Sequence, residues 1–511
     1  MSDTFEISGT TKTEILDQRG NTRLMLAVMA GQGSAVDSLI VAGADPNHCN
    51  NYGFSPLHCV SDVIIAARLV NAGAKFDVTT RNICQTPLHR AAKCGYASIV
   101  SFLIDAGAEM HCCDFLGNTP LHIAVIENHA DVVSLLIARG ASFDKQNSAG
   151  ETPLYSAAAS DHENMASILV AAGADLIRCE NTKQWTPLHI AAAKNSVKVA
   201  AVLILASNAQ LFSHYYQGTL MNVPVVDICD DMWRAPVHVA TRAGNCEMVT
   251  LLIDACAEFS FHDFNDQTPL LMATENNDEK MVSILIASGA SLDGTDSSLM
   301  TALLNACACG YNGIVEQLVA AGATFDDAEA ASTPLHVAVE NRQLDTIALL
   351  IHLGVDVDAK DRYGYTALFL AVSDKHYDMR VMKQLVDSGC DVDDIDEEEC
   401  TALHIAVRYR RYGSASLLIN SGATIDRIDA CGNTPIDIAR SSHDSQMVAL
   451  LTDAKKYQEY NRMISIGLLV QPLDLPVLVT YTIYCATPLY GKCVLSQSDA
   501  WHFLEKIKKM R

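Results

Sequence analysis

The four-residue motif Thr-Pro-Leu-His recurs along this chain at a nearly constant interval. Most successive starts are 33 residues apart, as between residues 86, 119 and 152. A fixed period of this length predicts an array of small units that bury their apolar faces against each other, rather than several independent domains. Complete copies begin at residues 86, 119, 186 and 333, and altered copies at residues 22, 55, 152, 235, 268, 301, 366, 401 and 434, which makes thirteen.

Each part of the motif predicts a local structure. Thr119 is a suitable helix N-cap, and Pro120 occupies the first helical position, where its missing N–H is harmless. Apolar residues within 132–137 then give a second short helix a buried stripe. Gly140 supplies the left-handed residue that ends this helix, and a polar loop rich in Asp, Asn and Gly leads to the next Thr. Each unit is therefore predicted to be a helix, a turn, a helix and a hairpin-like loop.

This unit resembles the ankyrin repeat over about residues 20–453. The resemblance implies an all-α repeat solenoid of helix-turn-helix units joined by β-hairpin-like loops, with a small C-terminal extension. It also implies a structural role for the histidine of the motif, which hydrogen-bonds between neighbouring units, whereas metal ligands would have to converge on one point. The histidines concerned are His58, His89, His122, His189, His238, His336 and His404.

Departures from the period divide the chain. The interval from residue 186 to 235 is 49, so about 16 residues are inserted around 210–231, and this segment is apolar and aromatic. It is either a projecting recognition loop or a self-packed insertion between two stacks of repeats. The predicted parts are a polar segment (1–19), repeats 1–6 (20–207), the insertion (208–231), repeats 7–13 (232–456) and a strand and helix tail (457–511).

Two further segments admit alternatives. Residues 391–399 include seven acidic residues and form either a solvated loop or a site for a basic partner. The arginines at 408–411 neutralise part of this negative charge. In the tail, residues 477–484 resemble a strand and 496–509 a helix. The spacing from Leu489 to Cys493 resembles a SOCS-box motif, which would make the chain the substrate-recognition subunit of a cullin-type ubiquitin ligase.

Composition excludes several classes of function. A net charge of −24 argues against nucleic acid and anionic membranes as partners. The 17 scattered cysteines indicate reduced thiols, and with no secretory or membrane-spanning segment they predict a cytoplasmic protein, with a nuclear location also compatible. No catalytic, phosphate-binding or zinc motif is present, so we expect no enzyme activity, no cofactor and no metal.

We therefore expect this chain to be a scaffold or adaptor that binds one or more proteins of unknown identity. The resemblance implies binding along the concave side, through loop tips and the ends of the first helices. Aromatic and arginine side chains there are the usual contributors to binding energy. The context of Asn47 also resembles that of ankyrin asparagines that are hydroxylated. The predicted partner-binding residues are Phe115, Trp185, Tyr216, Trp233, Arg242, Phe264, Tyr363, Arg408 and Tyr409.

Overall fold

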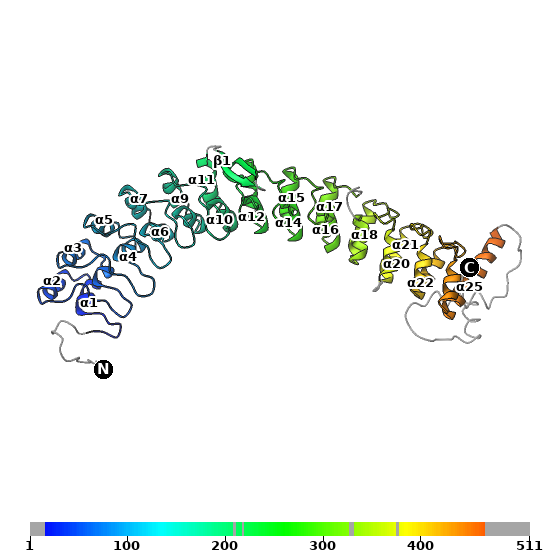
Figure 1. The fold of residues 1–511 in the computed structure, drawn as a ribbon, viewed down its shortest axis with the longest axis horizontal. Coiled ribbons are helices and arrows are strands. Elements are labelled where there is room, and N and C mark those ends of the chain that lie inside the picture. The colour runs from blue at the N-terminus through cyan, green and yellow to red at the C-terminus, as the bar shows by residue number, and fades with distance from the viewer. Residues whose placement is uncertain (1–15, 208–210, 217–218, 326–331, 375–377, 466–511) are drawn as a thin grey trace, which may run out of the picture. The chain divides into compact units, whose positions relative to one another are not determined.

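The computed structural model describes residues 16–207, 211–216, 219–325, 332–374 and 378–465 (Figure 1). Across these residues the repeats form thirteen pairs, each with a first and a second helix, as the period predicts. Repeats 1–6 consist of α1 (Arg23–Met29) and α2 (Gly33–Val41), the 3-10 turn η1 (Pro56–Cys59) and α3 (Val63–Asn71), α4 (Pro87–Lys93) and α5 (Ala97–Asp105), α6 (Pro120–Ile126) and α7 (Ala130–Ala138), α8 (Pro153–Ala159) and α9 (Glu163–Ala171), and α10 (Pro187–Lys194) and α11 (Val197–Ser207).

Repeats 7–13 follow the same plan, and the predicted all-α solenoid is confirmed. Their helices are α12 (Pro236–Arg242) and α13 (Cys246–Asp254), α14 (Pro269–Glu275) and α15 (Glu279–Ala287), α16 (Ala302–Cys309) and α17 (Asn312–Ala320), α18 (Pro334–Glu340) and α19 (Leu344–His352), α20 (Ala367–Ser373) and α21 (Met379–Asp387), α22 (Ala402–Arg408) and α23 (Tyr412–Asn420), and α24 (Pro435–Ser441) and α25 (Ser445–Ser465).

The helices group into two compact units, Met1–Ala290 and Ser291–Arg511. Unit 1 holds repeats 1–8 and unit 2 holds repeats 9–13. Within unit 1, α10 packs on α12 and α11 packs on α13, so repeats 6 and 7 stack directly on each other across the insertion. The part boundaries given by the sequence stay predictions, but the insertion does not interrupt the stack.

The insertion itself forms an antiparallel hairpin of β1 (Leu211–Tyr216) and β2 (Thr219–Pro224). Phe212 lies opposite Val223 in its register. A 3-10 turn, η2 (Val225–Asp227), then returns the chain to the array, and its residues are buried. Tyr216 ends β1, and its side chain lies outside the described residues.

The histidine of the motif joins each first helix to the next loop. The Nε2–H group of His122 donates to the carbonyl oxygen of Glu151 at 3.1 Å, and its Nδ1 lies 2.9 Å from the hydroxyl of the N-cap Thr119. The same ring therefore fixes the start of its own helix and the base of the following loop, which confirms the predicted structural role. Equivalent pairs of bonds are made by His58, His89, His189, His336 and His404.

His238 departs from this pattern because its N-cap residue is Ala235, which has no hydroxyl. The ring donates from Nε2 to the carbonyl oxygen of Phe261 at 2.9 Å, whereas the others reach the residue just before the next N-cap. Its Nδ1 atom is buried without a hydrogen-bond partner. A buried, unpaired nitrogen of this kind destabilises the folded state.

The C-terminal end differs from the sequence-based boundary. The last repeat was predicted to end at Lys456, but α25 continues to Ser465 and buries Met447, Leu451 and Ala454. The longer second helix covers the end of the stack, with its apolar side against the stack and its polar side toward solvent. The predicted strand 477–484, the predicted helix 496–509 and the segment Leu489 to Cys493 lie outside the described residues.

Burial makes the array sensitive to acid through its histidines. It lowers the pKa of His58 and of His122 to about 4, from an ordinary value near 6.5. The unfolded chain therefore binds more protons below pH 6.5, so stability that is complete above this pH declines as the pH falls toward 4. At pH 5 the local cost at His122 is about 2 kcal/mol. Hydrogen exchange of residues 119–126, corrected for intrinsic rates, should show this loss between pH 7 and pH 5.

A suitable control for this experiment is His122→Leu, because leucine stands at the same motif position in Leu271 and Leu304. The variant should lack the pH-dependent loss in residues 119–126. Equal loss in both proteins would mean that titration of His122 does not govern the stability of this repeat.

The defect at His238 predicts a stabilising substitution. Ala235 already has the extended backbone of an N-cap, with φ −72° and ψ 164°, close to the φ −77° and ψ 167° of Thr186. The substitution Ala235→Thr should therefore place a hydroxyl beside the first turn of α12. We expect about 1 kcal/mol of added local stability, seen as slower hydrogen exchange in residues 236–242. Thr268→Ala, which removes the cap of α14, should speed exchange in residues 269–275. Unchanged exchange in the Ala235→Thr variant would contradict this account.

Candidate protein-binding surface

The loop tips of unit 1 are held rigidly by backbone hydrogen bonds. Asp114 shapes one tip, since its carboxylate accepts the N–H groups of Leu116 and Asn118, both at 2.9 Å. The N–H of Phe115 donates to the carbonyl oxygen of Ile83 on the preceding tip at 2.9 Å. Equivalent bonds join tip to tip along unit 1: Asn51 to Arg19, Arg81 to Tyr52, Ser148 to Leu116, Asn181 to Ala149, Asp231 to Lys183 and Phe264 to Met232.

Three successive tips present large apolar side chains to solvent. Phe115 is 71% exposed, Leu116 56%, Tyr52 50% and Ile83 40%. We call these four residues the N-terminal tip strip. Sequence reasoning found only Phe115. The other three could have been found by aligning the loops on the polar residue at each tip, because each lies one to three residues after Asn50, Thr80 or Asp114.

A second aromatic pair lies further along unit 1. The rings of Trp233 and Phe264 pack edge to face with centroids 5.3 Å apart, and Phe264 is exposed. Tips at Ala149 and Lys183 separate this pair from the N-terminal tip strip, and the large apolar side chain there, Trp185, is half-buried beneath the Lys183 ammonium group. The structure therefore brings Trp233 and Phe264 together, whereas Phe115 belongs to the N-terminal tip strip.

Trp185 is tied into the scaffold. Its indole N–H donates to Asp230 at 2.9 Å, and Arg234 forms a 2.7 Å ion pair with the same carboxylate, whose side chain has no exposed surface. Burial by itself would raise the pKa of Asp230, but hydrogen bonds from Arg234 hold it below its usual value. Trp185 also stacks on His189. Its side chain thus connects repeats 6 and 7, a contact that sequence spacing did not indicate because the insertion separates the partners.

The predicted residues of the first helices lie in different surroundings. Arg242 is exposed at the end of α12. In unit 2, Arg408 is 3.6 Å from Glu398 and donates to the sulfur of Cys400 at 3.4 Å, while Tyr409 is exposed under the guanidinium of Arg411. Tyr363 is exposed at a tip, with Arg362 over its ring at 4.8 Å. The partner-binding roles of all nine residues stay predictions.

Most carboxylates of the acidic run 391–399 bind within unit 2. Asp393 accepts the N–H of Thr424 at 2.7 Å, and Asp394 forms a 3.0 Å ion pair with Lys360. Asp396 accepts the N–H groups of Glu398 and Cys400 and so shapes its own tip. The run therefore builds loops and joins repeats, and ion pairs with Lys360 and Arg408 neutralise part of its charge.

Asn47, like the aspartates of the acidic run, joins successive repeats through its side chain. Its amide oxygen accepts the N–H of Lys75 at 2.8 Å, and its amide nitrogen donates to the carbonyl oxygen of Gly73 at 2.9 Å. Asp144, Asp227, Asp358 and Asp393 accept from the following loop in the same way. The side chain of Asn47 thus connects repeats 1 and 2, and its hydroxylation stays a prediction.

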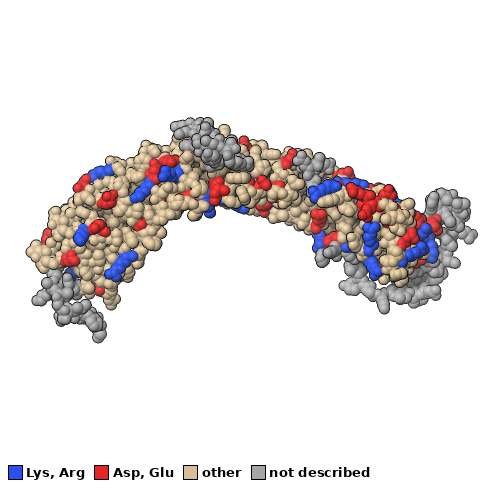
Figure 2. All heavy atoms as spheres, viewed as in Figure 1, with Lys and Arg blue, Asp and Glu red and all other residues tan. Residues whose placement is uncertain are grey.

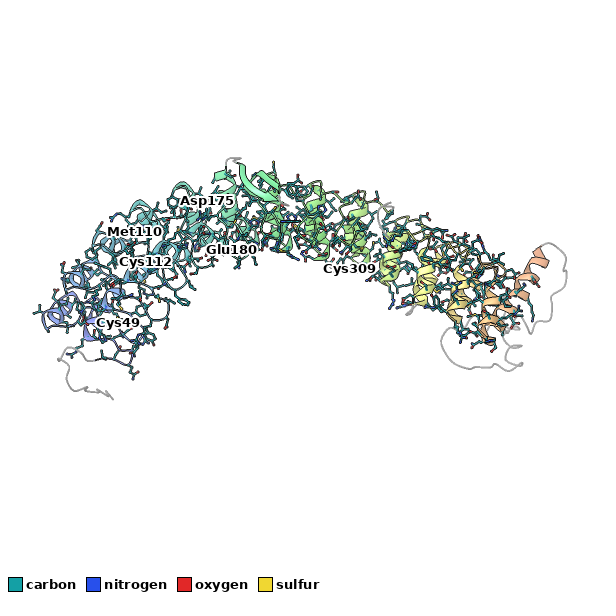
Figure 3. The ribbon with its side chains drawn as sticks, in the orientation of Figure 1. Cys49, Met110, Cys112, Asp175, Glu180 and Cys309 are labelled. Atoms are coloured by element: carbon teal, nitrogen blue, oxygen red, sulfur yellow. The ribbon has the colours of Figure 1, made fainter. Side chains whose placement is uncertain are left out.

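Chemically reactive side chains do not converge among the described residues. The fifteen cysteines in this part of the chain are free, and Cys49 and Cys112 lie in separate loops of unit 1 (Figure 3). Burial raises the pKa of the Cys112 thiol and so lowers its reactivity. No group of three or more His, Cys, Asp or Glu residues in the described ranges has the geometry of a metal site. No helix of those ranges is long and apolar enough to cross a membrane.

Comparisons with known proteins agree with this architecture. A family model described as ankyrin repeats (3 copies) matches residues 24–114, 62–147, 140–214, 237–329, 313–396, 335–429 and 379–463, which is more than half of the chain. A stretch of 96 residues is 32% identical to cyclin-dependent kinase 4 inhibitor B of Rattus norvegicus, and covers 18% of this chain and 74% of that protein. Another stretch of 99 residues is 32% identical to RelA-associated inhibitor of Mus musculus, of which it covers 12%.

The contacts of Asp230 predict a local defect in the variant Asp230→Ala. Removing the carboxylate leaves Arg234 without its partner and frees the indole of Trp185, so we expect a loss of about 3–5 kcal/mol at this junction. Hydrogen exchange of residues 229–235 should accelerate, and tryptophan emission should shift to the red. Asp231→Ala is the matched control, because Asp231 is the exposed neighbour, and it should change neither signal. Equal behaviour of the two variants would show that the buried pair does not hold this junction.

Proposed function

Since the chain belongs to the ankyrin-repeat family, we propose that it is a non-catalytic scaffold or adaptor that binds partner proteins along its loop tips and first helices. The observation that carries this proposal is the N-terminal tip strip, in which Tyr52, Ile83, Phe115 and Leu116 are exposed on loops that their backbones hold in place. Exposed apolar side chains on a preorganised surface lose little conformational entropy on binding, which favours affinity.

The position of the strip supports recognition by a surface rather than by a pocket. In unit 1, the first helices and the loops lie along one side of the stack and the second helices lie along the other (Figure 1). The strip therefore crosses several repeats on the side that carries the loops. A partner laid across it would contact several repeats at once, and its affinity would come from the sum of these contacts.

The names of the relatives agree with a binding role. RelA-associated inhibitor and cyclin-dependent kinase 4 inhibitor B are named for inhibiting other proteins. The match covers only a small part of this chain and 12% of the first relative, so the identity of the partner is not carried over. The absence of enzyme activity and the cytoplasmic location stay predictions of the sequence.

The alternative, a ubiquitin-ligase substrate receptor, depends on Leu489 to Cys493. This segment lies outside the described residues, and none of the described contacts favours that function. We therefore retain the interaction scaffold as the proposed function.

A fourfold substitution tests the proposal: Tyr52→Ser, Ile83→Ser, Phe115→Ser and Leu116→Ser. Because these side chains are exposed, the circular dichroism spectrum should be unchanged, while proteins captured from a cell lysate by the wild type should be reduced at least tenfold. Quantitative mass spectrometry of the captured proteins gives the measurement.

The matched control removes apolar surface from the other side of the stack: Val41→Ser, Ile64→Ser and Leu205→Ser. These residues lie on second helices and are between 58% and 89% exposed. Their replacement should leave capture intact. If the tip variant captures the same proteins as the wild type, or if both variants lose them equally, the tips are not the binding surface.

A further inference from the structure

The N-terminal tip strip lies in a part of this acidic array that is close to neutral. Residues 16–116, which hold the whole strip, contain seven Lys and Arg against eight Asp and Glu, a net charge of −1, although the whole chain carries −24. Figure 2 shows that most of the visible surface of the first repeats is neither acidic nor basic. A partner that approaches this end therefore does not face the negative potential that the average composition suggests.

Two arginines lie on either side of the tip that bears Tyr52. The carbonyl oxygen of Arg19 accepts the N–H of Asn51 at 3.0 Å, and the N–H of Arg81 donates to the carbonyl oxygen of Tyr52 at 2.9 Å. The tip that bears Tyr52 thus lies between these two residues along the stack. Both arginines are exposed, and among the described residues neither guanidinium has an ion pair.

The carboxylates of the same tips form no ion pair with these arginines among the described residues, although a hydrogen bond from the backbone of Asn21 and, to a smaller extent, the charge of Arg19 lower the pKa of Asp17. Asp17 accepts the N–H groups of Arg19 and Asn21, and Asp114 accepts those of Leu116 and Asn118, so both are engaged in shaping the loops. Some other arginines of unit 1 are paired, as in Arg68 with Asp37 and Arg139 with Asp105. Unpaired guanidinium groups beside exposed apolar side chains present a surface that matches carboxylates next to apolar residues.

We infer that the N-terminal tip strip, with Arg19 and Arg81, binds a partner segment in which acidic residues flank apolar side chains. The apolar side chains pack across Tyr52, Ile83, Phe115 and Leu116, and the carboxylates pair with the two guanidinium groups. Neighbouring repeats are spaced by about 10 Å, the usual distance between packed helices. The apolar residues of the segment therefore recur about every 10 Å, which corresponds to every third residue of a polyproline II segment, in which every third side chain lies on the same face. This inference rests on the proposed function and specifies the chemistry of the partner.

The test uses a display library of random 15-residue peptides, panned on the full-length protein. Peptides enriched by the wild type should contain Asp or Glu beside Leu, Ile or Phe. The charge-reversed variant Arg19→Glu/Arg81→Glu should bind these peptides at least tenfold more weakly in fluorescence anisotropy, and panned anew it should enrich Lys and Arg in place of Asp and Glu. The charge-conserving variant Arg19→Lys/Arg81→Lys should still enrich acidic peptides. Circular dichroism checks that each variant is folded.

The outcomes separate this inference from the proposed function. Enrichment that does not depend on charge reversal, or no enrichment above that of the fourfold serine variant, overturns the inference. If that happens while the fourfold variant still loses its lysate partners, the binding role of the tips stands and only the acidic chemistry is wrong. If the fourfold variant keeps both peptides and lysate partners, the proposed surface is wrong as well.

Discussion

The binding surface depends on the hydrogen bonds that each motif histidine makes in two directions. Nδ1 meets the N-cap hydroxyl and Nε2 meets a carbonyl of the next loop, as at His122 with Thr119 and Glu151. A neutral ring is required, because Nε2 must donate while Nδ1 remains available to the cap. Burial supplies this condition by lowering the pKa of the imidazole. The start of a helix and the direction of the following loop are thereby set by one side chain.

Because the loops are fixed in this way, an exposed apolar residue on them stays exposed in the folded chain. The backbone at Phe115 is fixed by hydrogen bonds to Asp114 and to the carbonyl of Ile83, and its side chain is exposed. The exposure of the N-terminal tip strip is thus a property of the folded chain, retained although it costs solvation free energy. A surface that stays exposed at such a cost is typical of a site where another protein binds.

Polar residues in the same loops have mainly structural roles. Asn47 and the aspartates at its position connect successive repeats, and the acidic run in unit 2 does the same through Asp393 and Asp394. The acidic residues counted along the sequence therefore include carboxylates whose oxygens are already hydrogen-bonded or ion-paired within the array. Near Tyr52 the opposite holds, since Arg19 and Arg81 have no ion pair in the described residues and their charge faces solvent.

The sequence by itself determined the repeat. Cap, proline, apolar spacing and terminal glycine are local signals, and they recur often enough to predict thirteen helical pairs. The resemblance to the ankyrin repeat then implied the structural role of the histidines. Those signals contain no information on contacts between distant residues. Only the tertiary structure decided that Trp185 joins Asp230 across the insertion, that α25 continues past Lys456, and that the strip includes Tyr52, Ile83 and Leu116. The physical reason is that exposure and pairing at a tip are set by the neighbouring repeat, whose position is fixed only when the helices stack.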